Sequence, residues 1–139
     1  NVQILECGLS DHLHDQEIFE RGSRSTLFFD PAVVCAARLE RISLIRLDDF
    51  LREQRIDRLR FWKLDVEYHE PEALAGASRI LRAKAIDAIL IELSHVTFDA
   101  VKAQLASVGY RLWRLDRRGL TRTDTLPGSG TYNLVAMPT

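Results

Sequence analysis

The first half of the chain carries short apolar stretches separated by polar turns, a pattern typical of strands. Residues 2–9 predict a short buried strand that closes at a turn. Residues 18–20 and 26–29 predict two further strands on either side of a turn at 21–23. A hairpin is therefore expected early in the chain.

The next stretch combines a strand with a helix start. Residues 42–47 predict a strand, and Asp48 follows it in the position of a helix-capping residue. Phe50 and Leu51 supply the apolar positions of that short helix. We therefore expect a strand that runs directly into a capped helix.

The second half is more regular and alternates strands with helices. Residues 60–67, 87–93, 110–115 and 132–137 predict strands, and Pro71 stands where a first helix would begin. The apolar positions of that helix recur at helical spacing: Leu74, Ala77, Ile80 and Leu81. The run at 87–93 is as apolar as a strand covered on both faces requires.

A second helix is predicted between residues 87–93 and 110–115. Thr97 can cap its start, and Gly109 can end it in a left-handed backbone conformation. Its inner face would hold four apolar side chains: Phe98, Val101, Leu105 and Val108. This helix completes a strand–helix–strand–helix–strand order.

That order predicts an α/β fold with a mostly parallel sheet. The last two strands have only a loop between them, so they should pair antiparallel at one edge of the sheet. The length of 139 residues fits one domain, spanning 1–139.

Composition and charge narrow the function classes. Hydrophobic residues make up 46% and charged residues 28% of the chain, as in a globular protein. The formal net charge of -1 gives no reason to expect a nucleic-acid partner, and no apolar stretch is long enough for a membrane span. Cys7 and Cys35 make no disulfide framework and are interpreted as reduced thiols, which favours a cytoplasmic location.

The strand at 60–67 contains the most informative polar residues. Because side chains alternate along a strand, Lys63, Asp65 and Glu67 share one face. Three ionisable residues on a strand between two others need an explanation, since unpaired buried charge is costly. Ligands of open α/β sheets bind beyond the carboxyl ends of the strands, where Asp65 and Glu67 lie and where Glu70 opens the next helix.

Two interpretations of these residues stay open. Carboxylates at this edge can accept a proton from a hydroxyl or orient it. Alternatively, Lys63 pairs with Asp65 or with a carboxylate on a neighbouring strand, such as Glu92. Glu70 would then only favour the start of a helix. A dedicated metal site would need more oxygen ligands than the sequence places there, so no metal is expected.

Short motifs follow one another in order from residue 47 to residue 77: Leu47-Asp48-Asp49-Phe50-Leu51, Ile56-Asp57, Lys63-Leu64-Asp65-Val66-Glu67, His69-Glu70 and Leu74-Ala75-Gly76-Ala77. This ordered set resembles the signature of FkbM-family methyltransferases, in which a T-L-D-D-L helix start precedes K-I-D-V-E-G-x-E and L-x-G-A. Segments outside it resemble further family landmarks: Asn1-Val2, Leu9-Ser10-Asp11, Ile91-Glu92, Val108-Gly109-Tyr110 and Asn133-Leu134-Val135-Ala136. The resemblance covers nearly the whole chain.

The resemblance implies a Rossmann-like class I methyltransferase sheet and S-adenosylmethionine as cofactor. Its substrates would be hydroxyl groups of sugars, glycolipids or natural products, methylated on oxygen. The implied catalytic residues are Asp65, Glu67, His69 and Glu70. The implied cofactor-binding residues are Ser10, Asp11 and Asp65. The implied substrate-binding residues are Tyr68, Glu92 and His95.

Two departures from the family pattern lead to an alternative. Tyr68 stands where the family has Gly, which permits backbone conformations that Tyr resists. The family's opening Gly-rich turn has no counterpart, so we expect a sheet truncated at the N-terminus by roughly 60 residues, at about 30 per strand–helix–strand unit. The alternative is a non-catalytic α/β module that binds a partner, with homo-oligomers forming through the incomplete sheet edge.

Overall fold

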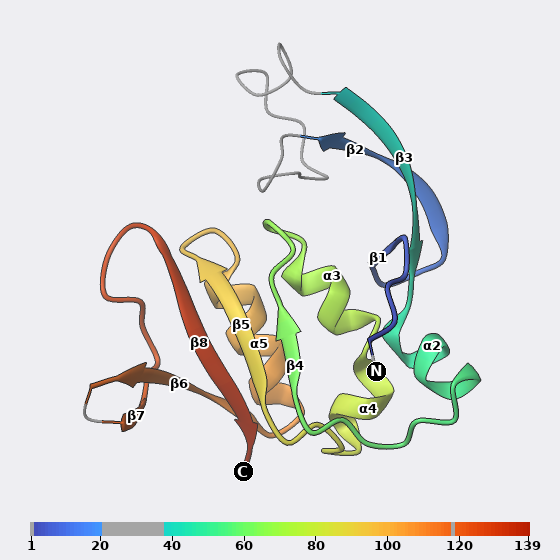
Figure 1. The fold of residues 1–139 in the computed structure, drawn as a ribbon. Helices are drawn as coiled ribbons and strands as arrows, with labels where there is room; N and C mark the ends of the chain where they lie inside the picture. The colour runs from blue at the N-terminus through green and yellow to red at the C-terminus, as the bar shows by residue number, and fades with distance from the viewer. Residues whose placement is uncertain (1, 21–37, 118) are drawn as a thin grey trace.

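A computed structural model describes residues 2–20, 38–117 and 119–139, and it contains two β-sheets and short helices (Figure 1). A three-stranded sheet has the order β1-β3-β2, and a five-stranded sheet has the order β4-β5-β8-β6-β7. The α/β class is confirmed, whereas the single sheet is not. The predicted strand at 26–29, the turn at 21–23 and Cys35 lie outside the described residues.

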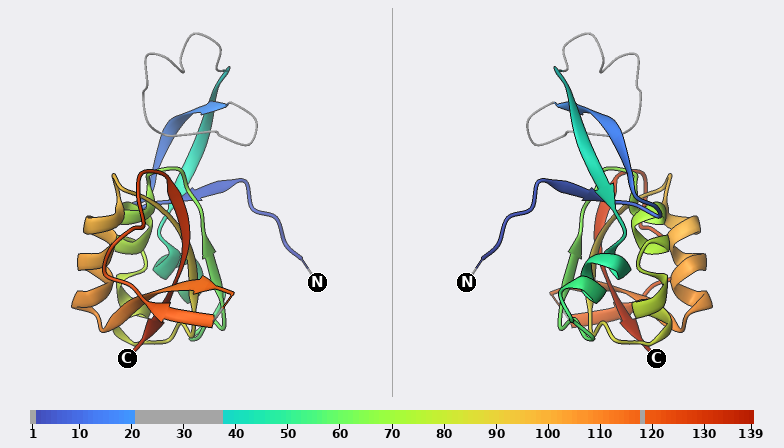
Figure 2. Two further views of the ribbon diagram at one scale, coloured as in Figure 1. Left: turned by 90° about the vertical axis from the view of Figure 1, so that its left-hand side faces the viewer. Right: turned by 90° about the vertical axis from the view of Figure 1, so that its right-hand side faces the viewer.

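The small sheet contains residues from the first third of the chain. Its strands are β1 (Cys7–Leu9), β2 (His14–Glu20) and β3 (Arg38–Ile45). The central strand β3 pairs parallel with β1 and antiparallel with β2. The prediction of a buried strand over 2–9 is wrong before Cys7, because residues 2–6 project away from the body with Val2 92% exposed (Figure 2).

The helices lie beside the five-stranded sheet: the last three cover one face of it (Figure 2), whereas the first lies beyond its edge (Figure 1). They are α2 (Leu47–Glu53), α3 (Glu70–Ala75), α4 (Ser78–Arg82) and α5 (Phe98–Ser107). The positions predicted from helical spacing are buried: Leu74, Ala77, Ile80 and Leu81. The single helix expected from Pro71 onward is wrong, because it is divided at residues 76–77 into α3 and α4.

Asp48 forms hydrogen bonds to the chain on both sides of this division. Its carboxylate accepts the backbone N–H groups of Arg79 (2.6 Å) and Ile80 (3.1 Å). Its own backbone N–H donates to the carbonyl of Gly76 at 3.0 Å. In a continuous helix, the N–H groups of Arg79 and Ile80 would donate to carbonyls four residues earlier, and the Gly76 carbonyl would accept from Ile80. The expectation that Asp48 caps the helix following residues 42–47 is therefore wrong, since it lies inside α2 and caps α4.

The large sheet combines one parallel pair with three antiparallel pairs. Its strands are β4 (Trp62–Leu64), β5 (Ile89–Ser94), β6 (Tyr110–Asp116), β7 (Gly119–Arg122) and β8 (Thr131–Pro138). Among the described strands of this sheet, the parallel pair is β4 with β5. The antiparallel pairing of the last two predicted strands, β6 and β8, is confirmed, although β8 lies between β5 and β6 rather than at an edge. The mostly parallel pairing is therefore wrong.

The two faces of this sheet have different surroundings. Residues that alternate toward the helices are buried in the hydrophobic core, among them Leu64, Ile91 and Leu134. On the opposite face Leu90 and Glu92 are only half-buried, so the prediction that residues 87–93 are covered on both faces is wrong. Since β4 is also an edge strand, the charged residues that alternate with its buried ones face solvent and not a core.

No helix within the described residues is long and apolar enough to cross a membrane.

Candidate functional site

The segment after β4 makes a sharp turn before α3 begins. Glu67 and Tyr68 both adopt a left-handed backbone, with φ angles of 45° and 73°. A side chain in this region costs energy that Gly avoids. Tyr68 therefore occupies, with strain, the position where the resemblance expects Gly. The turn directs residues 65–70 along the carboxyl ends of β4 and β5.

Three carboxylates meet at these strand ends. Lys63 Nζ donates to Asp65 Oδ2 at 2.8 Å, and this bond raises the pKa of Lys63. Glu92, on the neighbouring strand β5, has its pKa raised by partial burial and then by the negative charge of Asp65. Glu67 adds to this repulsion. The predicted Lys63–Asp65 pair is present, and the charge of Lys63 also partly opposes the rise in the pKa of Glu92.

Glu70 is buried next to this acidic group, with 3% of its surface exposed. One oxygen, Oε1, accepts the backbone N–H of Tyr68 at 3.2 Å, and Oε2 has no hydrogen-bond partner within the described residues. Burial raises the pKa of Glu70. The Thr97 hydroxyl lies close enough to oppose this shift but outside hydrogen-bond geometry.

A small pocket opens between the acidic residues and β8. It is lined by Glu67, Tyr68, Glu70, Glu92, Ser94 and Thr131, and its volume is about 10 Å³. This volume holds about one water molecule. In this conformation Tyr68 therefore leaves room at the strand ends for a hydroxyl-sized group only.

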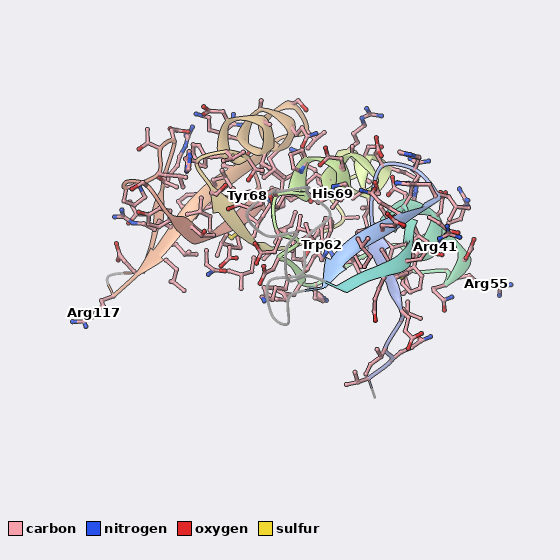
Figure 3. All side chains as sticks on the ribbon, turned by 90° about the horizontal axis from the view of Figure 1, so that it is seen from above. Arg41, Arg55, Trp62, Tyr68, His69 and Arg117 are labelled. Atoms are coloured by element: carbon pink, nitrogen blue, oxygen red, sulfur yellow. The ribbon has the colours of Figure 1, made fainter. Side chains whose placement is uncertain are left out.

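A second group of polar residues lies on the other side of the turn. His69 Nε2 and Ser10 Oγ are 3.2 Å apart, and Ser10 Oγ donates to Asp11 Oδ1 at 3.2 Å. His69 Nδ1 faces Glu72 Oε2 at 3.5 Å. Figure 3 shows His69 toward the three-stranded sheet and Tyr68 toward β5 and β8. The turn thus divides the candidate site into a histidine side and an acidic side.

Burial controls protonation on the histidine side. It lowers the pKa of His69, although the carboxylate of Glu72 opposes the shift, so the imidazole is neutral near pH 7. The pKa of Asp11 is lowered, chiefly by its hydrogen bond with His12. Ser10 is only 1% exposed and is already bonded to its neighbours. Asp11 is therefore the more accessible of the two predicted cofactor-binding side chains after β1.

The backbone of Ser10 is fixed by a close approach to Gly76. A Cβ atom at residue 76 would lie 2.0 Å from the Ser10 carbonyl oxygen, a distance that no side chain tolerates. Since Asp48 binds the Gly76 carbonyl and caps α4, the three residues form one junction, called here the Ser10–Asp48–Gly76 junction. It holds the histidine side of the site against the helices.

The predicted site residues separate into three locations. Asp65, Glu67, Tyr68, Glu70 and Glu92 lie on the acidic side, and Ser10, Asp11 and His69 lie on the histidine side. His95 is apart from both and lines another pocket. Among the described residues, no three His, Cys, Asp or Glu side chains are arranged to hold a metal ion.

Three further residues of the candidate site were not predicted from the sequence: Glu72, Ser94 and Thr131. Glu72 could have been found from its spacing, because it follows His69 by three residues on the same helical face. Ser94 and Thr131 come into the pocket through the antiparallel pairing of β5 with β8, in which they are direct partners. No local signal in the sequence specifies that pairing.

Comparison with known proteins identifies the family. The family described as the methyltransferase FkbM domain matches residues 9–112, which are 104 of the 139 residues. No curated protein and no solved structure matches the chain. The matched span contains both sides of the candidate site except Thr131. The chain therefore belongs to the FkbM family of methyltransferases.

Proposed function

We propose that this protein transfers a methyl group from S-adenosylmethionine to a hydroxyl oxygen of a sugar, glycolipid or related natural product. Family membership supports methyl transfer. The observation that carries the choice of oxygen is the group of Asp65, Glu67 and Glu92 at the carboxyl ends of two adjacent parallel strands. Such carboxylates suit an acceptor that must be oriented and lose a proton.

The cofactor would be held at the same sheet end. Its sulfonium supplies an electrophilic methyl group when bound. Asp11 and Asp65 keep part of their carboxylates exposed and can accept hydrogen bonds from amino or hydroxyl groups. The hydroxyl of Ser10, bonded to Asp11 and His69, would position Asp11 and not contact the cofactor itself. These residues fit a polar, hydroxyl-rich ligand.

The acidic side would handle the acceptor. Asp65 and Glu67 would accept the hydroxyl hydrogen and orient the oxygen toward the methyl group. Glu92 has a pKa raised by partial burial and then by the nearby carboxylates of Asp65 and Glu67, which makes it a suitable acceptor for the released proton. Glu70 would brace the turn through the Tyr68 N–H. His69, neutral and partly buried, would act as a second base only if the acceptor reached the histidine side.

A non-catalytic α/β module is a second candidate function. The pocket of about 10 Å³ beneath Tyr68 favours it, because an acceptor needs more room than one water molecule. The paired state of Lys63 and Asp65 favours it as well. Under this hypothesis the turn at residues 65–70 has a structural role and takes no part in a reaction.

Calorimetric titration of S-adenosylhomocysteine into the full-length protein separates the two candidates. Methyl transfer predicts micromolar binding, about -8 kcal/mol, and incorporation of labelled methyl groups into hydroxylated acceptors. An Asp65→Asn variant should keep its fold and lose the transfer. A folded full-length protein that neither binds S-adenosylhomocysteine nor labels any acceptor would leave the module as the better account.

A further inference from the structure

A larger pocket lies next to the small one, between α5 and the segment that connects β7 with β8. Its volume is about 540 Å³, which is within the range of about 300–1,000 Å³ for small-molecule sites. Phe98 and Leu126 supply apolar surface, while Asp99, Asp124 and His95 supply polar groups. Neither side of the candidate site described above includes this pocket.

Lys102 builds one wall of the pocket. Its ammonium donates to the backbone carbonyl of Asp124 at 3.0 Å, which ties α5 to the 123–130 segment. The same ammonium faces Asp99 Oδ1 at 3.8 Å and lies 5.2 Å from the centre of the Phe98 ring. Lys102 is therefore engaged by groups of the protein, and Asp99 balances its charge.

The remaining polar groups favour a neutral ligand with hydroxyl groups. The carboxylates of Asp99 and Asp124 are largely solvent-exposed, with 90% and 70% of their side-chain surfaces accessible. Asp99 faces Lys102 at 3.8 Å and Asp124 faces Arg122 at 4.0 Å, so the charges around the pocket are balanced and favour no ligand charge, while the carboxylates still accept hydrogen bonds. A ring with hydroxyls on its rim and C–H groups on its faces can donate hydrogen bonds to these polar groups and rest on the apolar surface of Leu126 and Phe98.

The two pockets are built by the same two segments. Ser94 and Thr131, which pair directly across β5 and β8, line the small pocket. His95 and Ser129, one and two residues away, line the large one. We propose that the large pocket binds a neutral sugar ring of the acceptor while its reacting hydroxyl lies in the small pocket. This inference rests on the proposed function and specifies its substrate.

Heteronuclear NMR tests the pocket without cofactor or turnover. The probes are methyl glucoside, glucuronate and cyclohexanol, each titrated into the ¹⁵N-labelled protein. We expect methyl glucoside to shift the amide signals of residues 95–102 and 123–130 with millimolar affinity, at least threefold tighter than glucuronate or cyclohexanol. No shifts with methyl glucoside, shifts confined to other residues, or a preference for either of the other probes would overturn the proposal.

Variants locate the binding and its charge selectivity. Ser129→Trp places an indole in the pocket and should abolish the shifts, whereas Thr121→Trp, on the exposed strand β7, should leave them intact. Thr125→Trp, another lining position, replaces Ser129→Trp if the latter does not fold. Asp99→Asn combined with Asp124→Asn should remove the threefold preference over glucuronate. Unchanged binding in the filled variant would refute the site.

The outcome is independent of methyl transfer. Sugar binding without S-adenosylhomocysteine binding would support the pocket and count against the proposed reaction. Methyl transfer to sugars, combined with unchanged binding of methyl glucoside by Ser129→Trp, would support the reaction and refute the pocket.

Discussion

Asp48 and Glu70 are both buried carboxylates beside short helices, each 3% exposed, but their surroundings differ. Both oxygens of Asp48 accept backbone N–H groups of α4. Glu70 has one oxygen bonded to Tyr68 and one without a partner among the described residues, and burial raises its pKa. Asp48 is thus held by the backbone of the fold, whereas one oxygen of Glu70 is left for a water molecule or a ligand.

The same contrast separates the Ser10–Asp48–Gly76 junction from the turn at 65–70. The junction has short backbone hydrogen bonds and a close backbone approach. The turn has two left-handed residues and like-charged side chains. Both lie within the span that matches the FkbM domain, so acidic residues of one matched segment have different surroundings. Substitutions in the two regions should therefore have different effects.

Asp65→Asn and Glu67→Gln should each reduce methyl transfer by about 10²–10⁴-fold, because they remove the groups that orient and deprotonate the acceptor. The free energy of unfolding should change by less than about 0.5 kcal/mol. Turnover assays and urea titration measure the two quantities. Glu53→Gln, an exposed acid at the end of α2, is the matched control. Normal turnover in both variants would remove these residues from the reaction.

Asp48→Ala should lower the free energy of unfolding by about 2–4 kcal/mol, because two buried N–H groups of α4 lose their acceptors. Urea denaturation measures the loss. Asp49→Ala is the control, since Asp49 makes only partly exposed ion pairs with Arg46 and Arg52 and should cost less than about 1 kcal/mol. Equal losses in the two variants would contradict a specific role for Asp48.

Tyr68→Gly should raise the free energy of unfolding by about 1 kcal/mol, because glycine removes the strain of a side chain at a φ of 73°. Thermal or urea denaturation can detect this change. Tyr68→Phe, which keeps the strain and removes only the hydroxyl, should leave stability within about 0.5 kcal/mol of the parent. A glycine variant less stable than the parent would mean that contacts of the Tyr68 ring outweigh the strain.

At pH 7, Glu92→Gln should raise the free energy of unfolding above that of the parent protein by about 0.5 kcal/mol more than it does at pH 4. The difference is small because solvent screens the charges around Glu92. The folded-state pKa of Glu92 is raised, so the stability that it contributes is present below its unfolded pKa and lost as pH rises through the folded value. The amide variant does not show that loss. Urea titrations at the two pH values give the difference, and an effect of opposite sign would contradict the crowding of Glu92 by Asp65.

The sequence predicted those features that depend on local periodicity. The inward positions of the helices, the shared face of Lys63 and Asp65, and the left-handed end of α5 at Gly109 follow from spacing and residue type. The insertion of β8 between β5 and β6 does not, because alternation specifies a face and not a neighbour. The partners of Asp48 are 31 and 32 residues away, beyond any local pattern.

The candidate site was predicted in part for the same reason. Motif order placed Asp65, Glu67 and Glu70 at one sheet end, and the departure at Tyr68 pointed to the strained backbone there. The bond between His69 and Ser10 joins residues 59 positions apart, and spacing along the chain cannot reveal it.

The Ser10–Asp48–Gly76 junction also has a kinetic consequence. Its three residues come from separate parts of the chain, so forming it closes two long loops, and each closure costs entropy before any contact compensates it. Proteins fold more slowly when their contacts join residues that are far apart in the sequence. The histidine side, which depends on the position of Ser10, should therefore form late in folding. A chain released from the ribosome before that step would carry its acidic turn without a completed site.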